Sequence, residues 1–127
     1  MDRDLPQNAL LVLTTCDSAA SAAALAEHLV GTRLAACVNA IDRVASTYTW
    51  ESRIEHATET LLLIKTTSAR YAAVESAIRQ RSSYELPEVV AVPVDRGLPG
   101  YLDWVRSATA TEGVGAAVAS DDDVREG

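Results

Sequence analysis

The sequence of 127 residues has no phenylalanine and only one lysine, Lys65. Leu, Val, Ile and Ala must therefore fill the core of the single domain that this length favours. Two cysteines, Cys16 and Cys37, are too few for a disulfide framework, and a free thiol in an apolar segment fits a reducing compartment. No basic patch and no apolar run long enough to span a bilayer occur. We therefore expect no nucleic-acid partner, no membrane and a cytoplasmic location.

Acidic residues are concentrated at the two ends of the chain, whose formal net charge is −7. This acidity says little about a partner, because the middle of the chain is nearly balanced. We predict a flexible tail over residues 1–7, a folded domain over 8–110 and a disordered acidic tail over 111–127.

The hydrophobic pattern predicts the order β-α-β-β-α-β followed by a short C-terminal helix. This order is typical of the α+β ferredoxin-like fold, an antiparallel sheet with helices on one face. In that fold strands 2 and 4 lie at the edges, and Pro93 fits an edge because it cannot donate to a ladder. We expect Gly31 to end the first helix and Ser68 to cap the second. The expected strands are Ala9–Leu13, Leu34–Trp50 with a bend near Asp42, Ile54–Thr66 and Glu88–Val94, and the last helix is Tyr101–Thr109.

The second and third strands are too long for their helices. They would extend roughly 40–55 Å at about 3.3 Å per residue, whereas the helices span only about 20 Å at roughly 1.5 Å per residue. The far end of this hairpin, around Tyr48, Trp50 and Ile54, then has nothing of its own chain to pack on, which predicts that other subunits cover it. The alternative is that strand 2 folds back at Asp42-Arg43 as two short strands.

Common catalytic and phosphate-binding motifs are missing, since no G-x-S-x-G, P-loop, G-x-G-x-x-G, H-E-x-x-H or C-x-x-C pattern occurs. Cys16 lies between a strand and a helix start. That place can lower the pKa of a thiol and make it reactive or a metal ligand, or Cys16 is an ordinary loop residue. Lys65 either lines a pocket for an anionic group or is a strand-end residue that reaches solvent. Cys37 is expected in the core.

Five short motifs occur in order between about Leu10 and Ala108, and together they resemble the divalent-cation tolerance protein CutA family. The motifs are Leu34-Ala-Ala-Cys-Val38, Tyr48-x-Trp50-Glu51, Glu59 followed by Leu63-Ile-Lys65-Thr66, Tyr84-Glu-Leu-Pro-Glu88, and Tyr101-Leu-x-Trp104.

The resemblance implies a ferredoxin-like fold and a tight homotrimer similar in design to PII signal-transduction proteins. It also implies a non-enzymatic role in tolerance of divalent metals, notably copper, with no cofactor required. It makes Cys16 and Glu59 the candidate ligands for copper or another divalent ion. It further implies ligand-binding clefts between subunits, around Trp50, Glu51, Lys65, Tyr84 and Glu85.

The sequence departs from the family pattern at three places. The family usually has His-Pro where this chain has Ser82-Ser83, and serine is a poor substitute for histidine as a copper ligand. Some members carry a cysteine at the position of Thr14, two residues before Cys16. The family turn Trp-Glu-Gly becomes Trp50-Glu51-Ser52, which leaves no glycine for a left-handed residue.

Two other functions fit the same residues. One is a PII-like signalling module that holds a small anionic ligand near Lys65. The other is a trimeric scaffold that docks a second protein through its acidic tail.

Overall fold

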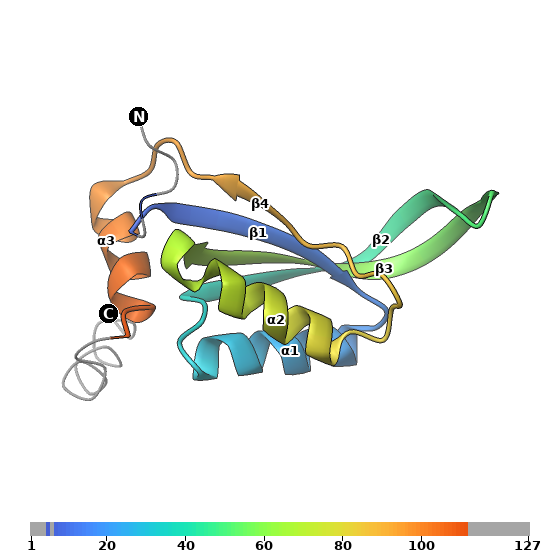
Figure 1. Ribbon diagram of the computed structural model, residues 1–127, viewed down its shortest axis with the longest axis horizontal. Coiled ribbons are helices and arrows are strands. Elements are labelled where there is room, and N and C mark those ends of the chain that lie inside the picture. The colour runs from blue at the N-terminus through green and yellow to red at the C-terminus, as the bar shows by residue number, and fades with distance from the viewer. Residues whose placement is uncertain (1–4, 6, 112–127) are drawn as a thin grey trace.

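One four-stranded antiparallel sheet carries helices on one face in the computed structural model, which describes Leu5 and residues 7–111 (Figure 1). The strand order β2-β3-β1-β4 is that of the ferredoxin-like fold, so the predicted class and topology are confirmed. Nearly all of both predicted tails lies outside the described residues, and their disorder stays a prediction. The elements are β1 (Ala9–Cys16), α1 (Ala19–Gly31), β2 (Cys37–Trp50), β3 (Arg53–Thr67), a 3₁₀ turn (Ser68–Arg70), α2 (Tyr71–Arg81), β4 (Val90–Pro93) and α3 (Pro99–Ala108).

Strand β1 lies in the middle of the sheet, where its apolar run pairs with β3 on one side and β4 on the other. It continues three residues past the predicted end at Leu13. These three residues pair with Leu62, Leu61 and Thr60 of β3. The buried Thr14 also donates a hydrogen bond of 2.7 Å to the carbonyl oxygen of Glu88, which satisfies its hydroxyl inside the sheet. Strand β4 is an edge strand, as Pro93 predicted.

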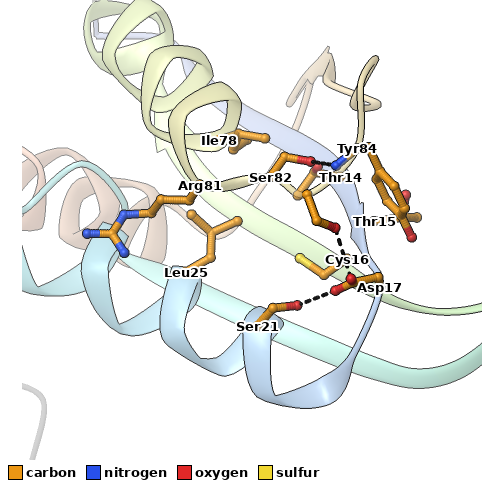
Figure 2. A pocket seen from close by; sticks show the side chains of 11 residues that line it. Thr14, Thr15, Cys16, Asp17, Ser21, Leu25, Ile78, Arg81, Ser82 and Tyr84 are labelled. Carbon is orange, nitrogen blue, oxygen red and sulfur yellow. Dashed lines mark hydrogen bonds between the residues drawn. The ribbon is translucent and has the colours of Figure 1, made fainter.

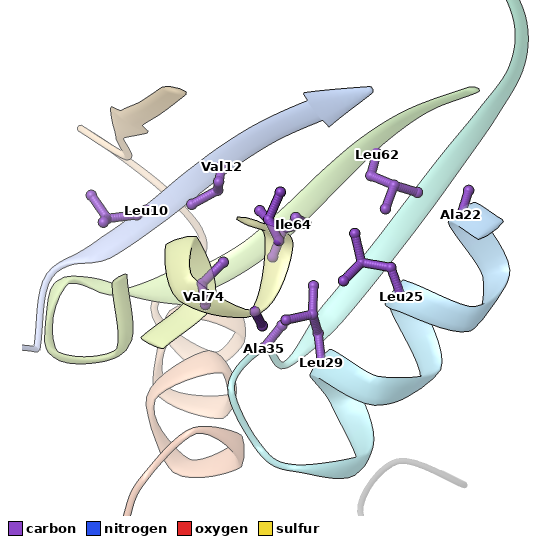
Figure 3. Close-up of a cluster of buried hydrophobic side chains, with 11 residues drawn as sticks. Leu10, Val12, Ala22, Leu25, Leu29, Ala35, Leu62, Ile64 and Val74 are labelled. Atoms are coloured by element: carbon purple, nitrogen blue, oxygen red, sulfur yellow. The ribbon is translucent and has the colours of Figure 1, made fainter. Parts of the chain in front are cut away.

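The core lies between the sheet and helices α1 and α2 and is built of aliphatic side chains (Figure 3). Leu29, Leu62, Ile64 and Ile78 are each 1% exposed or less, which shows that the absence of phenylalanine leaves no open core. Full burial of each such side chain contributes about 1.5–3 kcal/mol to folding.

Strands β2 and β3 form one long hairpin that projects beyond the helices (Figure 1). Pairing continues from Cys37 opposite Lys65 to Trp50 opposite Arg53, so the alternative of two short strands is wrong. The predicted bend is a β-bulge, because the register shifts between Ile41 and Val44. Beyond this bulge the hairpin is a two-stranded ribbon.

Left-handed backbone occurs at positions that carry no glycine. In the hairpin turn both Glu51 (φ 51°) and Ser52 (φ 66°) have positive φ, so the turn keeps a left-handed shape although Ser52 replaces the expected glycine. After α1 the left-handed residue is Arg33 (φ 63°), whereas Gly31 lies inside the helix. Helix α1 therefore ends at Gly31 as predicted, but Gly31 is its last helical residue and not the C′ residue that follows the helix.

The starts of two helices also differ from the prediction. Ser68 caps nothing with its side chain, because a 3₁₀ turn precedes α2 and Arg70 occupies the N-cap position. Helix α3 begins at Pro99, two residues before the predicted start, since proline is well suited to a first helical turn. Ser18 caps α1 and accepts a hydrogen bond from the backbone N–H of Ser21.

Candidate functional site

A small polar cavity of about 50 Å³ lies at the C-terminal end of β1, between the start of α1 and the loop that follows α2 (Figure 2). This volume is enough for a few water molecules or one small ion. Its lining residues come from three segments that are distant in sequence: Thr14, Thr15, Cys16, Asp17, Ser21, Leu25, Ile78, Arg81, Ser82, Ser83 and Tyr84.

Asp17 joins two walls of this cavity. Its carboxylate accepts hydrogen bonds of 2.9 Å from the hydroxyls of Ser83 and Ser21 (Figure 2), and these bonds hold the pKa of Asp17 below its usual range. Ser82 accepts a 3.0 Å hydrogen bond from the backbone N–H of Tyr84. The serine pair at the His-Pro position of the resemblance therefore stabilises the loop, and the sequence did not indicate that Asp17 would be its partner.

Cys16 is half-buried and packs against the core under the helices. Burial raises the pKa of its thiol, and the carboxylates of Asp17 and Glu59 raise it further. Of the two possibilities for Cys16, this disfavours a thiol activated by the helix start, because desolvation and two nearby negative charges raise its pKa. At neutral pH Cys16 is a protonated thiol.

A short hydrogen bond joins Glu59 and Tyr84 near the cavity. The Tyr84 hydroxyl donates a hydrogen bond of 2.7 Å to Oε2 of Glu59, across a separation of 25 residues in sequence. Burial is the main cause that raises the pKa of Tyr84 well above its usual range, and the hydrogen bond to Glu59 is the second. Burial also disfavours the charged form of Glu59, but hydrogen bonds from Ser46, Tyr84 and Thr15 outweigh it and lower the Glu59 pKa.

The two predicted metal ligands lie on opposite faces of the sheet. Cys16 pairs with Thr60, whose side chain is buried beneath the helices, so Cys16 shares the helix face. Glu59 precedes Thr60 in β3 and therefore lies on the other face, because side chains alternate along a strand. Within Leu5 and residues 7–111 no three His, Cys, Asp or Glu side chains are grouped as a metal site. One chain does not bring Cys16 and Glu59 together around one ion.

Lys65 lies on the face of the sheet that the helices leave open. Its ammonium group hydrogen-bonds to Oδ1 of Asn39 and is 4.0 Å from Sγ of Cys37. Cys37 is paired with Lys65 across the strands and is half-buried on this open face, so its prediction as a core residue is wrong. Asn39 was missed, although its position two residues after Cys37 places it on the same strand face.

The five residues predicted around one ligand cleft are spread along the chain. Trp50 and Glu51 lie at the hairpin tip, whereas Lys65 lies roughly 40 Å away along β3 at about 3.3 Å per residue. Tyr84 contacts Glu59 near the middle of β3, and Glu85 is exposed in the following loop. A single chain forms no cleft from these residues.

Apolar side chains are exposed on the open face of the sheet and along the hairpin. Ile41 is 46% exposed and Val92 is 50% exposed on this face, where Val92 is paired with Leu11 of β1. On the projecting hairpin, Ile54 is 73% exposed and Trp50 is 37% exposed. Exposed apolar surface of this extent is typical of an interaction site.

Comparison with known proteins decides the family. The model of the CutA1 divalent ion tolerance protein family matches residues 10–108, nearly all of the described chain. The chain belongs to this family. The resemblance read from the five sequence motifs is thereby confirmed.

Several CutA proteins are similar over most of this chain. Divalent-cation tolerance protein CutA of Thermus thermophilus is 38% identical over 99 residues, which cover 78% of this chain and 96% of that protein. Protein CutA of Mus musculus is 39% identical over 105 residues, 83% of this chain and 59% of that protein. The crystal structure of CutA from Xylella fastidiosa superposes with a TM-score of 0.79 at 38% identity, covering 81% of this chain and 99% of that one.

Length separates the chain from some of its CutA relatives. It spans 59–60% of the length of the mouse, Xenopus laevis and human proteins that it matches. Among the helices of the described residues, none has both the length and the apolar character needed to cross a membrane.

Proposed function

We propose that this CutA family member acts in divalent-cation tolerance as a non-enzymatic homotrimer that binds copper or another divalent ion between its subunits. The single observation that carries the proposal is the long, partly apolar β2–β3 hairpin, whose far end has no packing partner among the described residues, in a protein whose family is named for divalent-cation tolerance.

The pairing of the strands supports the assembly. Strand β1 pairs with β3 only from Thr60 to Thr67, so the part of β3 from Arg53 to Glu59 pairs with β2 alone. A two-stranded ribbon is at best marginally stable in water. Neighbouring copies that cover the ribbon and the open sheet face would bury the exposed apolar groups and stabilise both.

Native mass spectrometry of the full chain at micromolar concentration tests the assembly. We expect a species of three chains that persists on dilution to the low micromolar range. A well-folded single chain under these conditions would contradict the proposed trimer, and with it every cleft between subunits.

The proposed metal site draws its ligands from more than one subunit. Cys16 and Glu59 are the donors in question, and in one chain they lie on opposite sheet faces, so a second copy must complete the coordination of either residue. A thiolate suits copper or zinc, and a carboxylate suits most divalent ions. Contacts between subunits can bring together side chains that one chain holds apart.

Titration calorimetry with Cu(II) and Zn(II), on protein without an affinity tag, tests direct binding. We expect saturable heat for the wild type and binding at least tenfold weaker in Cys16→Ser or Glu59→Gln, because each variant removes a ligand. Cys37→Ser is the matched control and should bind as the wild type does. No heat at high micromolar concentration would contradict direct binding and leave only an indirect role in tolerance.

The alternative functions and the location stay predictions. A PII-like anion site at Lys65 requires a thermal shift by an anionic metabolite that Lys65→Ala abolishes. A docking scaffold requires a partner that is lost when the acidic tail is removed. The CutA relative from Archaeoglobus fulgidus is described as periplasmic and that from Arabidopsis thaliana as chloroplastic, so family membership does not decide the compartment.

A further inference from the structure

A second hollow, separate from the cavity at Cys16, lies at the opposite end of β1. Its volume is about 420 Å³, and its lining residues come from the start of β1, the end of β3 and the end of α3. Figure 1 shows these elements meeting at one end of the sheet. The lining residues are Gln7, Thr67, Ala69, Arg70, Arg106, Thr109, Ala110 and Thr111. This volume is in the range of small-molecule sites in proteins.

The charged residues that line this hollow are both arginines. Among the described residues, Arg70 and Arg106 line the hollow and no aspartate or glutamate does, although the whole chain carries a net charge of −7. Asp103 contacts Arg106 from outside the lining and offsets part of its charge. The hollow therefore has a positive character that the overall composition does not predict.

The two guanidinium groups differ in how they are held. Arg106 donates from Nε to the carbonyl oxygen of Gln7 at 2.8 Å and from Nη1 to Asp103 at 3.0 Å, which fixes its plane. Nε of Arg70 is buried and has no hydrogen-bond partner among the described residues. A buried donor without an acceptor is unfavourable, and more so when the group is charged. Arg70 also lines the hollow, so an anion bound there would lie beside its guanidinium group.

Helix α2 adds to the positive potential at this place. It begins directly after Arg70 and has no side-chain cap, so the positive end of its dipole is not neutralised by a capping side chain. The alanine side chains of Ala69 and Ala110 form apolar parts of the lining. A ligand with one anionic group and one apolar portion matches both properties.

We propose that the hollow at Arg70 and Arg106 binds a small organic anion, whose phosphate or carboxylate contacts the two guanidinium groups and whose apolar portion lies against the alanines. Arginine suits this role because its planar fork of N–H donors matches the geometry of both oxyanions. The site is independent of the proposed metal site, because it lies at the other end of β1.

Titration of the full chain with phenyl phosphate, followed by calorimetry at low ionic strength, tests the site. Benzoate probes a carboxylate in place of the phosphate, and phenol serves as the neutral probe. We expect both anions to bind once per chain and phenol not to bind. Arg70→Gln and Arg106→Gln should each weaken phenyl phosphate at least tenfold, as expected for loss of a hydrogen bond to a charged group.

Arg79→Gln is the matched control, because it removes the same charge from an exposed position on α2. Its affinity should equal that of the wild type, and circular dichroism with thermal melting should show that all variants fold. Three outcomes would overturn the proposal. They are no binding to the wild type, equal weakening in Arg79→Gln, and binding that appears only when Asp121, Asp122 and Asp123 are changed to Asn, which would assign the arginines to the chain's own acidic segment.

Discussion

At the scale of single residues, the hydrogen bond between Tyr84 and Glu59 ties the loop after α2 to the middle of β3. Tyr84→Phe removes the donor and should lower the free energy of unfolding by about 1–2 kcal/mol at neutral pH. Urea unfolding at a fixed protein concentration measures this. Tyr48→Phe, in the hairpin, is the comparison and should cost less, since Tyr48 is 46% exposed.

The same contact predicts a dependence on alkaline pH. The pKa of Tyr84 is raised in the folded protein, whereas tyrosine in an unfolded chain ionises near pH 10. The stabilisation from Tyr84 is thus fully present below about pH 10 and is lost as the pH rises further. The difference in unfolding free energy between wild type and Tyr84→Phe should therefore shrink above about pH 10. A difference that grows there would contradict the assigned contact.

The thiol of Cys16 should react slowly with alkylating agents at neutral pH. Burial and two carboxylates raise its pKa, so the reactive thiolate forms only at alkaline pH. In the Cys37→Ser variant, where Cys16 is the remaining cysteine, the rate of alkylation by iodoacetamide should keep rising beyond pH 9. A plateau below pH 8 would show that the thiol is activated instead.

If Cys16 binds copper, the apparent affinity should also rise with pH, since the metal must displace the thiol proton.

At the scale of secondary-structure elements, the hairpin turn holds two side-chain-bearing residues in left-handed backbone. Such a conformation costs roughly 1–2 kcal/mol per residue without glycine. Ser52→Gly should therefore raise the free energy of unfolding by up to about 1 kcal/mol, measured by denaturant unfolding. Thr49→Gly, in the strand just before the turn, is the control and should lower stability by about 0.5–1 kcal/mol. Equal effects of the two variants would contradict the assigned turn geometry.

The ends of helices and strands were predictable where the hydrophobic pattern was long. They were missed where a tertiary contact lengthened an element beyond that pattern. The bend near Asp42 and the edge position of β4 were indicated by the sequence. A polar pair interrupts the apolar pattern of β2, and a proline cannot donate a hydrogen bond inside a sheet. The extension of β1 through Thr14 to Cys16 consists of pairing with β3 and is accompanied by the bond from Thr14 to Glu88, a residue 74 positions away. The sequence around β1 carries no signal of that partner.

At the scale of the whole molecule, the proposed assembly requires the open sheet face to be an interface between subunits. Val92→Asp places a charge on this face and should convert the proposed trimer into smaller species, because burying an unpaired carboxylate is costly. Light scattering coupled to size-exclusion chromatography measures the mass. Leu86→Asp is the control, since Leu86 is a loop residue that is 73% exposed, and it should leave the mass unchanged. Unchanged mass in Val92→Asp would mean that this face is not an interface.

The sequence by itself determined the order of the elements, the fold class and the family, because hydrophobic periodicity and short motifs are local properties of the chain. It also indicated the long hairpin and the residues Cys16, Glu59, Lys65 and Tyr84. Only the tertiary structure decided how these side chains relate to one another. Strand register placed Cys16 and Glu59 on opposite faces of the sheet. Tertiary packing brought Tyr84 to Glu59 and placed Arg70 and Arg106 around one hollow. These contacts join residues that are distant in sequence, and a local sequence pattern carries no information about them.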